Sequence, residues 1–289
     1  MIKKSSLIRN VSLKLSLIFS DYWLAYFRFL QKHRYFPRFR HPRSLSEKIN
    51  YIKLYNRNPV RKKITDRVEV RDFVNAKTPD LMFPRLYWYG LDLTEDQYHR
   101  LPEKFVLKAN HGSGMVEVVK KSDYSYSDLV NIINDWLKVD YSKFGREWFY
   151  RDLEKYVLAE EFLQVDKDAP PDYKFFVVCG KVEFVQVDLS RFSDHRRNIL
   201  DREGRLLPVT LLYDNNPSFV NIPEGFEKAI SFSETLGREF DLIRVDLYIV
   251  DGIVYFGELT NAPENGFGKF SDKNFDFQVG GKLPMFVDR

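Results

Sequence analysis

The stretch over residues 243–263, IRVDLYIVDGIVYFGELTNAP, contains Arg244, Asp246 and Glu258, whose types and spacing suit phosphate and metal chemistry. The stretch reads as a β-hairpin that turns at its Asp-Gly pair. A three-residue loop over 250–252, with its glycine left-handed, shifts the strand register by one residue relative to a two-residue turn. Only the shifted register keeps Glu258 out of the apolar face, so we expect Asp246 and Glu258 to share a polar face with Arg244. The apolar face should then carry Val245, Leu247, Ile249, Ile253, Tyr255 and Leu259.

The shared face favours one kind of ligand. Two carboxylates on neighbouring strands repel each other unless a proton or a cation lies between them. Mg²⁺ bound to a polyphosphate suits such a pair, because this ion prefers a few carboxylates together with substrate oxygens. The alternative is a solvated sheet face on which Arg244 and Asp246 form an ordinary ion pair.

A second candidate site is the glycine-containing segment FVLKANHGSG. It places Lys108 at the end of an expected strand, directly before the flexible loop His111–Gly114. Glycines let backbone N–H groups approach an anion closely, and the lysine adds positive charge. The spacing fits neither a Walker A motif nor a dinucleotide fingerprint. His111 could contact phosphate, whereas a plain turn with a solvated histidine is the alternative.

Two further strands offer polar residues. The run YVLAEEFLQ ends in Glu160 and Glu161, followed by Leu163 at a free backbone edge, where a carboxylate and backbone groups could read an adenine. In DYKFF, strand alternation puts Asp172 and Lys174 on one face, which could hold a ribose and a phosphate. Acids at a strand exit and an exposed ion pair are the ordinary interpretations of these two patterns.

The order of these segments resembles that of the ATP-grasp superfamily, and most closely its TupA-like family, which is tied to bacterial surface polysaccharide (teichuronopeptide) synthesis. The matching segments are SEKINYIKLY, TDRVEVRDFV, LPEKFVLKANHGSG, DYKFFVVCGKV and RVDLYIVDGIVYFGELTNAP, and together they cover about residues 45–270. The resemblance implies an α+β ATP-grasp fold, in which two α+β subdomains grip ATP, preceded by a smaller N-terminal helical or α+β region.

The resemblance also implies cofactor contacts for individual residues. The ATP phosphates would be contacted by Lys108 and by the loop residues Gly112, Ser113 and Gly114, with His111 as a further candidate. Glu160 would face the adenine amino group, and Asp172 would hold the ribose. Backbone contacts to the adenine would come from Glu161 and Leu163.

The reacting end of ATP would lie at the hairpin. Lys174 and Arg244 would face the γ-phosphate as catalytic residues, and Asp246 and Glu258 would ligate Mg²⁺. Many ATP-grasp ligases have Glu-x-Asn at the metal strand, whereas this chain has Thr260 followed by Asn261, which are therefore the candidates for a third ligand. The TDR tripeptide stands where the family pattern predicts Asp-Lys, which leaves the role of Arg67 open.

The implied reaction is an ATP- and Mg²⁺-dependent ligation, in which a phosphorylated carboxylate is attacked by an amine and ADP is released. The expected substrates are an amino acid or other amine and a uronic acid on a glycan or lipid-linked glycan. A sugar or polysaccharide kinase is one alternative. A non-catalytic nucleotide-binding protein, which the threonine at position 260 would suit, is another.

The elements that must position these residues fall into three regions. We expect a basic amphipathic segment over 1–43, an N-terminal α/β region over 44–102 with a helix that begins at Ser44 or Ser46, and an ATP-grasp domain over 103–289. Strands and helices follow one another in an order that favours α+β architecture with mainly antiparallel sheets. The single cysteine, Cys179, lies in an apolar run and should be a small core residue, which fits a reducing, cytoplasmic compartment.

The net charge of the whole chain is only +4, but its N-terminal segment is strongly basic. Residues 1–43 carry ten Lys or Arg and one acid, Asp21. Charges interrupt its apolar run, so it is not a convincing transmembrane span, and no cleavage site marks a secretory signal. It would lie on the inner face of the cytoplasmic membrane or pack on the body of the protein. Nucleic acid is not an expected partner, because no recognised motif accompanies the charge.

Overall fold

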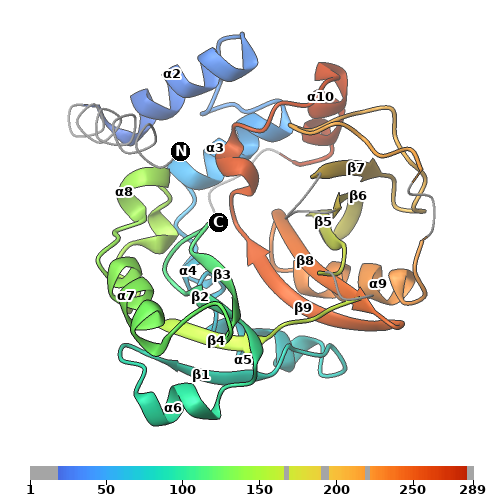
Figure 1. The fold of residues 1–289 in the computed structure, drawn as a ribbon. Coiled ribbons are helices and arrows are strands. Elements are labelled where there is room, and N and C mark those ends of the chain that lie inside the picture. Colours follow the sequence, from blue (N-terminus) through green and yellow to red (C-terminus); the bar gives the residue numbers. More distant parts are fainter. Residues whose placement is uncertain (1–18, 166–168, 190–194, 219–221, 285–289) are drawn as a thin grey trace.

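Two antiparallel sheets and the helices around them form the protein (Figure 1). The computed structural model describes residues 19–165, 169–189, 195–218 and 222–284. The smaller sheet has the strand order β1-β4-β2-β3 and the larger has the order β7-β6-β5-β8-β9. This α+β architecture is the expected one.

The smaller sheet consists of β1 (Leu86–Gly90), β4 (Val157–Glu161), β2 (Lys104–Ala109) and β3 (Val116–Lys120). Its apolar face packs against α6 (Glu95–Arg100) and α7 (Tyr126–Leu137), which begin with capping boxes at Thr94 and Ser125. Because β1 pairs with β4, the sheet crosses the domain boundary that we expected near residue 102. That boundary is therefore wrong: the region over 44–102 is not a separate unit.

The larger sheet consists of β5 (Asp172–Val178), β6 (Lys181–Leu189), β7 (Arg196–Leu200), β8 (Leu242–Val250) and β9 (Ile253–Thr260). One face is apolar throughout and is covered by α5 (Glu69–Lys77) and α9 (Phe226–Gly237). The other face is divided. Its apolar end packs against α3 (Leu45–Leu54) and α10 (Lys273–Gly281), and its polar end carries the candidate site.

Short helical pieces complete the described chain. Residues 60–77 contain two helices, α4 (Val60–Lys63) and α5, and α3 has Ser44 as its N-cap, with a capping box to Glu47. The remaining pieces are α2 (Asp21–His33), α8 (Ser142–Gly145), η1 (Trp148–Tyr150) and η2 (Pro263–Gly266). Within the described ranges, no helix is long and apolar enough to cross a membrane.

The β8–β9 hairpin has the expected pairing of Asp246 with Glu258, but its turn and the position of its register shift differ from the expectation. Val250 pairs with Ile253, so the turn has two residues, and both have positive φ. The one-residue shift occurs instead at Gly257, a bulge between the pairs Asp246–Glu258 and Leu247–Phe256. The three-residue loop was therefore wrong, although Asp246 and Glu258 do lie opposite each other. The buried residues of β9 are Val254, Phe256 and Leu259, whereas Ile253 is exposed.

Cys179 also differs from the expectation. It is exposed, with φ +48°, and forms the two-residue β5–β6 turn together with Gly180. The apolar run before it forms the buried strand β5, and the chain leaves the core one residue before the cysteine. Cys179 is not a core residue.

Candidate active site

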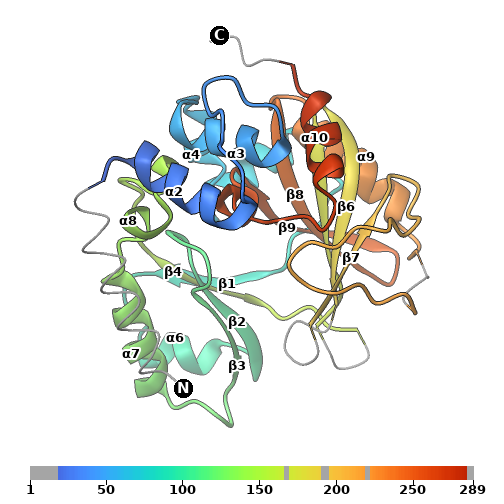
Figure 2. The ribbon, with the colours of Figure 1, turned by 90° about the horizontal axis from the view of Figure 1, so that it is seen from above.

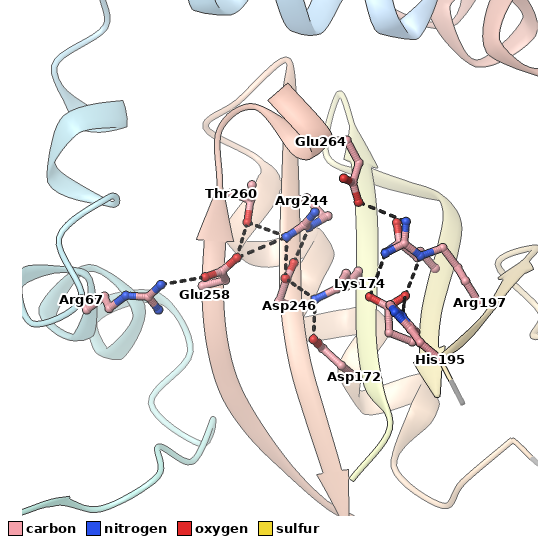
Figure 3. A network of polar contacts seen from close by, with 12 residues as sticks. Arg67, Asp172, Lys174, His195, Arg197, Arg244, Asp246, Glu258, Thr260 and Glu264 are labelled. Atoms are coloured by element: carbon pink, nitrogen blue, oxygen red, sulfur yellow. Dashed lines mark hydrogen bonds and ion pairs between the residues drawn. The ribbon is translucent and has the colours of Figure 1, made fainter. Parts of the chain in front are cut away.

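The polar end of the larger sheet carries a cluster of opposite charges (Figure 3). Arg244 Nε donates to Asp246 Oδ1 at 2.7 Å, and Arg244 Nη2 donates to Asp246 Oδ2 at 2.8 Å. The same Nη2 reaches Glu258 Oε1 at 3.2 Å and Thr260 Oγ1 at 3.0 Å. Burial lowers the pKa of Arg244, but the two carboxylates outweigh it and raise this pKa above its ordinary value. The structure therefore brings four predicted site residues together.

Lys174 extends this cluster onto β5. Its Nζ donates to Asp246 Oδ2 at 2.8 Å and to Asp172 Oδ2 at 2.5 Å. Lys174, Asp172 and Asp246 are all buried, so each charge depends on its neighbours for compensation. The sequence placed Asp172 and Lys174 on one face, and pairing of β5 with β8 brings that face to Asp246.

Arg67 connects the two sheets. Its Nε donates to the carbonyl oxygen of Ala109 at the end of β2, at 3.0 Å, and its Nη2 lies 3.4 Å from Glu258 Oε2. Burial opposes ionisation of Glu258, but Arg67 and Arg244 together hold the pKa of this carboxyl well below its usual range. Arg67, whose role the sequence left open, thus belongs to the site.

The acid before Arg67 explains why the TDR segment lies here. Asp66 Oδ1 accepts hydrogen bonds from the backbone N–H groups of Val68 and Glu69 at the start of α5. Asp66 Oδ2 accepts from the side chain of Asn110, the residue that follows β2, at 3.0 Å. Asp66 therefore fixes α5 to the loop after Lys108. In the sequence, Asp66 directly precedes Arg67, and Asn110 lies two residues after Lys108. This closeness to charged residues was the available sequence signal.

The smaller sheet contributes a second set of charges. Lys108 donates to Glu160 Oε1, and Arg71 Nη2 lies 3.4 Å from Glu160 Oε2, so the predicted adenine residue is held between two cations. The side chain and backbone N–H of Glu161 are both bonded to the backbone of Arg85. Leu163 follows β4 in irregular, half-buried chain.

The loop after β2 is organised differently from a solvated turn. His111 is buried: its Nε2 contacts the carbonyl oxygen of Trp136 at 2.9 Å, and its Nδ1 contacts Asn110 Oδ1 at 3.1 Å. Burial lowers the pKa of this imidazole. His111 is therefore a structural residue, contrary to its expected contact with phosphate, whereas Ser113 and Gly114 are exposed at the tip of the loop. A Cβ on Gly112 would lie 2.8 Å from the Tyr141 ring, so this glycine permits a close approach.

Asn261 does not join the carboxylates. Its Oδ1 accepts from Arg61 Nη1 at 3.0 Å, and its Nδ2 donates to the Arg61 carbonyl oxygen at 2.8 Å and to Thr65 Oγ1 at 3.0 Å. Both side-chain polar atoms are thus committed to Arg61 in α4 and to Thr65, two residues after that helix. Of the two expected candidates for a third metal ligand, only Thr260 faces the cluster, where its hydroxyl donates to Glu258 Oε1 at 2.9 Å.

A small cavity of about 40 Å³ lies between the two sheets. Its walls include residues of both sheets and of the α8–η1 segment, among them Arg67, Asn110, Glu147, Tyr150, Glu160, Glu258 and Thr260. Glu147 was not expected here. It is buried, and burial raises its pKa to about 7, although Lys53 acts in the opposite direction.

A second polar group on the same sheet face was also missed. Asp188 on β6 accepts from Arg197 Nε at 2.6 Å, lies 3.2 Å from His195 Nε2, and is a neighbour of Asp172 across the strands. Arg197 also lies 3.1 Å from Glu264, in the turn after β9. Burial opposes the shift, but Arg197 lowers the pKa of Asp188 to about 2. Polar residues therefore extend from β9 to β7 (Figure 3).

Comparison with known protein families gives this site its context. The sequence profile of the family described as TupA-like ATPgrasp matches residues 47–283, most of the chain. The chain belongs to the TupA-like ATP-grasp family. The matched region contains every charged residue of the cluster, from Arg67 to Glu258. Comparison with curated proteins returned no match.

Solved structures of ATP-grasp ligases are similar only at low identity. D-Alanine–D-alanine ligase of Bacillus anthracis, complexed with ATP, is 15% identical over 69% of this chain and 54% of its own, with a TM-score of 0.43. The corresponding ligase of Helicobacter pylori is 14% identical over 78% and 60%, with a TM-score of 0.43. The ligase PsnB, with a variant precursor, Mg and ADP, is 11% identical over 78% and 58%, with a TM-score of 0.45. The chain thus spans a little over half the length of these ligases.

Proposed function

We propose that this TupA-like ATP-grasp protein is an ATP- and Mg²⁺-dependent carboxylate–amine ligase that works through an acyl-phosphate and releases ADP. The observation that carries this proposal is the convergence of Arg244, Asp246, Glu258 and Thr260 on one sheet, facing Arg67 from the other side of the cavity. Cations and carboxylates at one buried place are what transfer of a phosphoryl group requires, because its catalysis is mostly positioning and electrostatic stabilisation.

The donor atoms fit Mg²⁺. Asp246 and Glu258 are opposite each other on β8 and β9, and Thr260 adds a hydroxyl oxygen beside them. Two carboxylates leave most coordination positions to phosphate oxygens and water, as this ion prefers. Among the described residues, no group of three or more His, Cys, Asp or Glu is suited to a metal. When bound, the ion would neutralise charge on the transferred phosphoryl group.

The protein's own residues account for the remaining steps. In this proposal the phosphates are contacted by Lys108, which bonds to Glu160 in this structure, and by the exposed residues Ser113 and Gly114. Glu160 near the end of β4 and Leu163 just after it would contact the adenine. Arg244 and Lys174 would stabilise the γ-phosphoryl group as it moves to the acceptor carboxylate. Once the substrates are bound, the residues around the cavity would have to exclude bulk water, because an acyl-phosphate is hydrolysed by it.

For substrates we propose an amine, such as an amino acid, and the carboxylate of a uronic acid in a surface glycan or its lipid-linked precursor. This choice rests on the link between TupA-like proteins and surface polysaccharide synthesis that the sequence resemblance implied. The alternative is phosphorylation of a sugar hydroxyl by the same ATP site. Both reactions need the carboxylate pair, so the products distinguish them.

The test measures Mg²⁺-dependent ADP release by wild type and Glu258→Gln, with amino acids and uronic-acid acceptors, followed by mass spectrometry of the products. ADP release that requires both an amine and an acid, with a product lighter than its parts by one water, would establish the ligase. A phosphorylated sugar formed without an amine would establish the kinase. ATP protection against thermal unfolding without turnover would point to a nucleotide-binding protein.

A further inference from the structure

Helix α2 has two different faces. Ala25, Phe29 and His33 are buried against the body of the protein, together with Phe39 from the loop that follows. Phe19, Trp23 and Phe27, spaced four residues apart, form an outward stripe with exposed fractions of 39%, 49% and 50%. An amphipathic helix that has already buried its inner face has no structural need for this second, aromatic one.

The loop after α2 continues the aromatic pattern. Phe36 has an exposed fraction of 70%, the highest among the large hydrophobic side chains of the described chain. Its neighbours Arg34, Arg38 and Arg40 are also exposed. A phenylalanine at the tip of a basic loop combines an apolar ring, whose transfer out of water is favourable, with charged groups that remain solvated.

The charged residues of α2 and the loop after it are nearly all basic. Residues 19–43 contain six Lys or Arg and a single acid. That acid, Asp21, is already paired with Arg146 at 2.7 Å and Arg151 at 2.9 Å. A surface that binds a protein usually has charged residues of both signs around its rim. A surface that binds anionic lipid is basic, with aromatic residues among the charged ones.

We propose that Phe19, Trp23, Phe27 and Phe36, with Arg34, Arg38 and Arg40, form a docking surface for anionic membranes. We call these residues the aromatic-basic surface. The aromatic rings enter the boundary between headgroups and acyl chains, and the arginines contact lipid phosphates.

This surface is connected to the candidate active site. The two arginines that pair with Asp21 flank residues 147–150, which supply Glu147 and Tyr150 to the cavity between the sheets. Tyr150 also lines a wider pocket of about 470 Å³, together with His111, Arg146 and Lys155. Figure 2 shows α2 at the edge of the molecule beside α8. If the proposed ligase is correct, docking would bring this pocket near a lipid-linked acceptor.

The test is binding of the full chain to vesicles. This binding needs neither ATP nor an acceptor, so its result does not depend on whether the proposed ligase activity is correct. We expect co-sedimentation with vesicles of phosphatidylglycerol and phosphatidylcholine, and little with phosphatidylcholine alone. Phe27→Ser/Phe36→Ser and Arg34→Gln/Arg38→Gln/Arg40→Gln should each weaken binding by about tenfold or more. Vesicles should also shift the tryptophan emission to the blue, and Trp23→Phe should abolish that shift but retain binding.

Leu91→Ser is the matched control, because Leu91 is exposed to 54% directly after β1 of the smaller sheet, outside the aromatic-basic surface, and should not affect binding. Thermal unfolding of each variant checks that it is folded. Absence of wild-type binding to anionic vesicles would overturn the proposal, as would equal binding by wild type and both multiple variants. A dimer that the aromatic substitutions dissociate, without vesicle binding, would instead make this surface an interface between two copies.

Discussion

Buried cations hold the site together at the level of single residues. Lys174 lies between Asp172 and Asp246, and Arg244 lies between Asp246 and Glu258, so carboxylates and cations alternate across the strands. Glu258 is partly exposed, but Asp172, Lys174 and Asp246 are buried, so removing Lys174 leaves two carboxylates charged where water has little access. These residues should therefore matter for stability as well as for turnover.

Lys174→Met should lower the free energy of unfolding by about 3–5 kcal/mol at neutral pH, because two buried carboxylates lose their shared cation. Burial already raises the pKa of Asp246, and loss of the lysine should raise it further, so folding takes up a proton and the loss should be smaller at pH 5. Urea unfolding at both pH values measures this. Lys174→Met/Asp172→Asn should recover part of the loss, and a loss that is the same at both pH values would contradict the explanation.

We expect Glu147 to accept a proton in the proposed reaction. It is buried in the wall of the cavity, and burial raises its pKa to about 7. An attacking amine must lose a proton, so we expect kcat to rise as pH increases through about 7 and Glu147 becomes ionised. Glu147→Gln should lower kcat and flatten this profile, whereas Glu154→Gln, on an exposed side chain nearby, should leave it unchanged. An unaltered pH profile in Glu147→Gln would remove this role.

At the level of elements, the bulge at Gly257 decides which face Glu258 occupies. A Cβ at this position would lie 2.8 Å from the carbonyl oxygen of Asp246 and 3.2 Å from the Tyr248 ring. Gly257→Ala should therefore cost about 1–3 kcal/mol and reduce ATP turnover by displacing the carboxylate pair. Gly281→Ala is the matched control, because an added Cβ there meets no atom within 4 Å. Full turnover in Gly257→Ala would show that the bulge does not position Glu258.

The contact between α3 and α10 should make stability depend on pH. Asp276 is buried and accepts from the N–H and hydroxyl of Ser46, at 2.9 Å and 3.1 Å. Burial raises its pKa from 3.8 to about 6, so between these values the folded protein holds a proton that the unfolded chain has lost. Stability from this group is complete below pH 4 and is lost as pH rises through about 6.

Asp276→Asn keeps an oxygen for Ser46 and removes the titration. The difference in unfolding free energy between variant and wild type should therefore shift in favour of the variant by about 3 kcal/mol between pH 4 and pH 7. Denaturant unfolding across this range measures the difference. A constant difference would mean that another group causes the pH dependence.

At the level of the whole molecule, the two sheets meet through Arg67 and Glu258 around a cavity of about 40 Å³. That volume suits one or two waters and not a nucleotide. ATP binding should therefore move the sheets apart. Spin labels at the exposed positions Val116 on β3 and Ile253 on β9, in a Cys179→Ser background, should lie farther apart with a non-hydrolysable ATP analogue and Mg²⁺. A label pair on Lys181 and Ile253, both in the larger sheet, is the control, and an unchanged distance between Val116 and Ile253 would contradict sheet opening.

The sequence by itself determined the local features of this protein. Strand alternation placed Asp172 beside Lys174, and the motif order indicated the family and most of the charged site residues. The sequence offered Ser44 or Ser46 as a helix cap, and Ser44 is the N-cap of α3. Each of these depends on neighbouring residues or on a motif, which a sequence displays directly.

Only the tertiary structure decided which polar groups meet. Asn261 adjoins the metal strand in sequence, but its amide is bound to Arg61, and His111 is buried under Trp136 and not at a phosphate. Arg67, Glu147 and Arg197 reach the site from elements distant in the chain, and the Gly257 bulge restored a register that the turn alone would have reversed. Side-chain partners and strand register depend on contacts between remote segments, and those contacts exist only once the two sheets have formed.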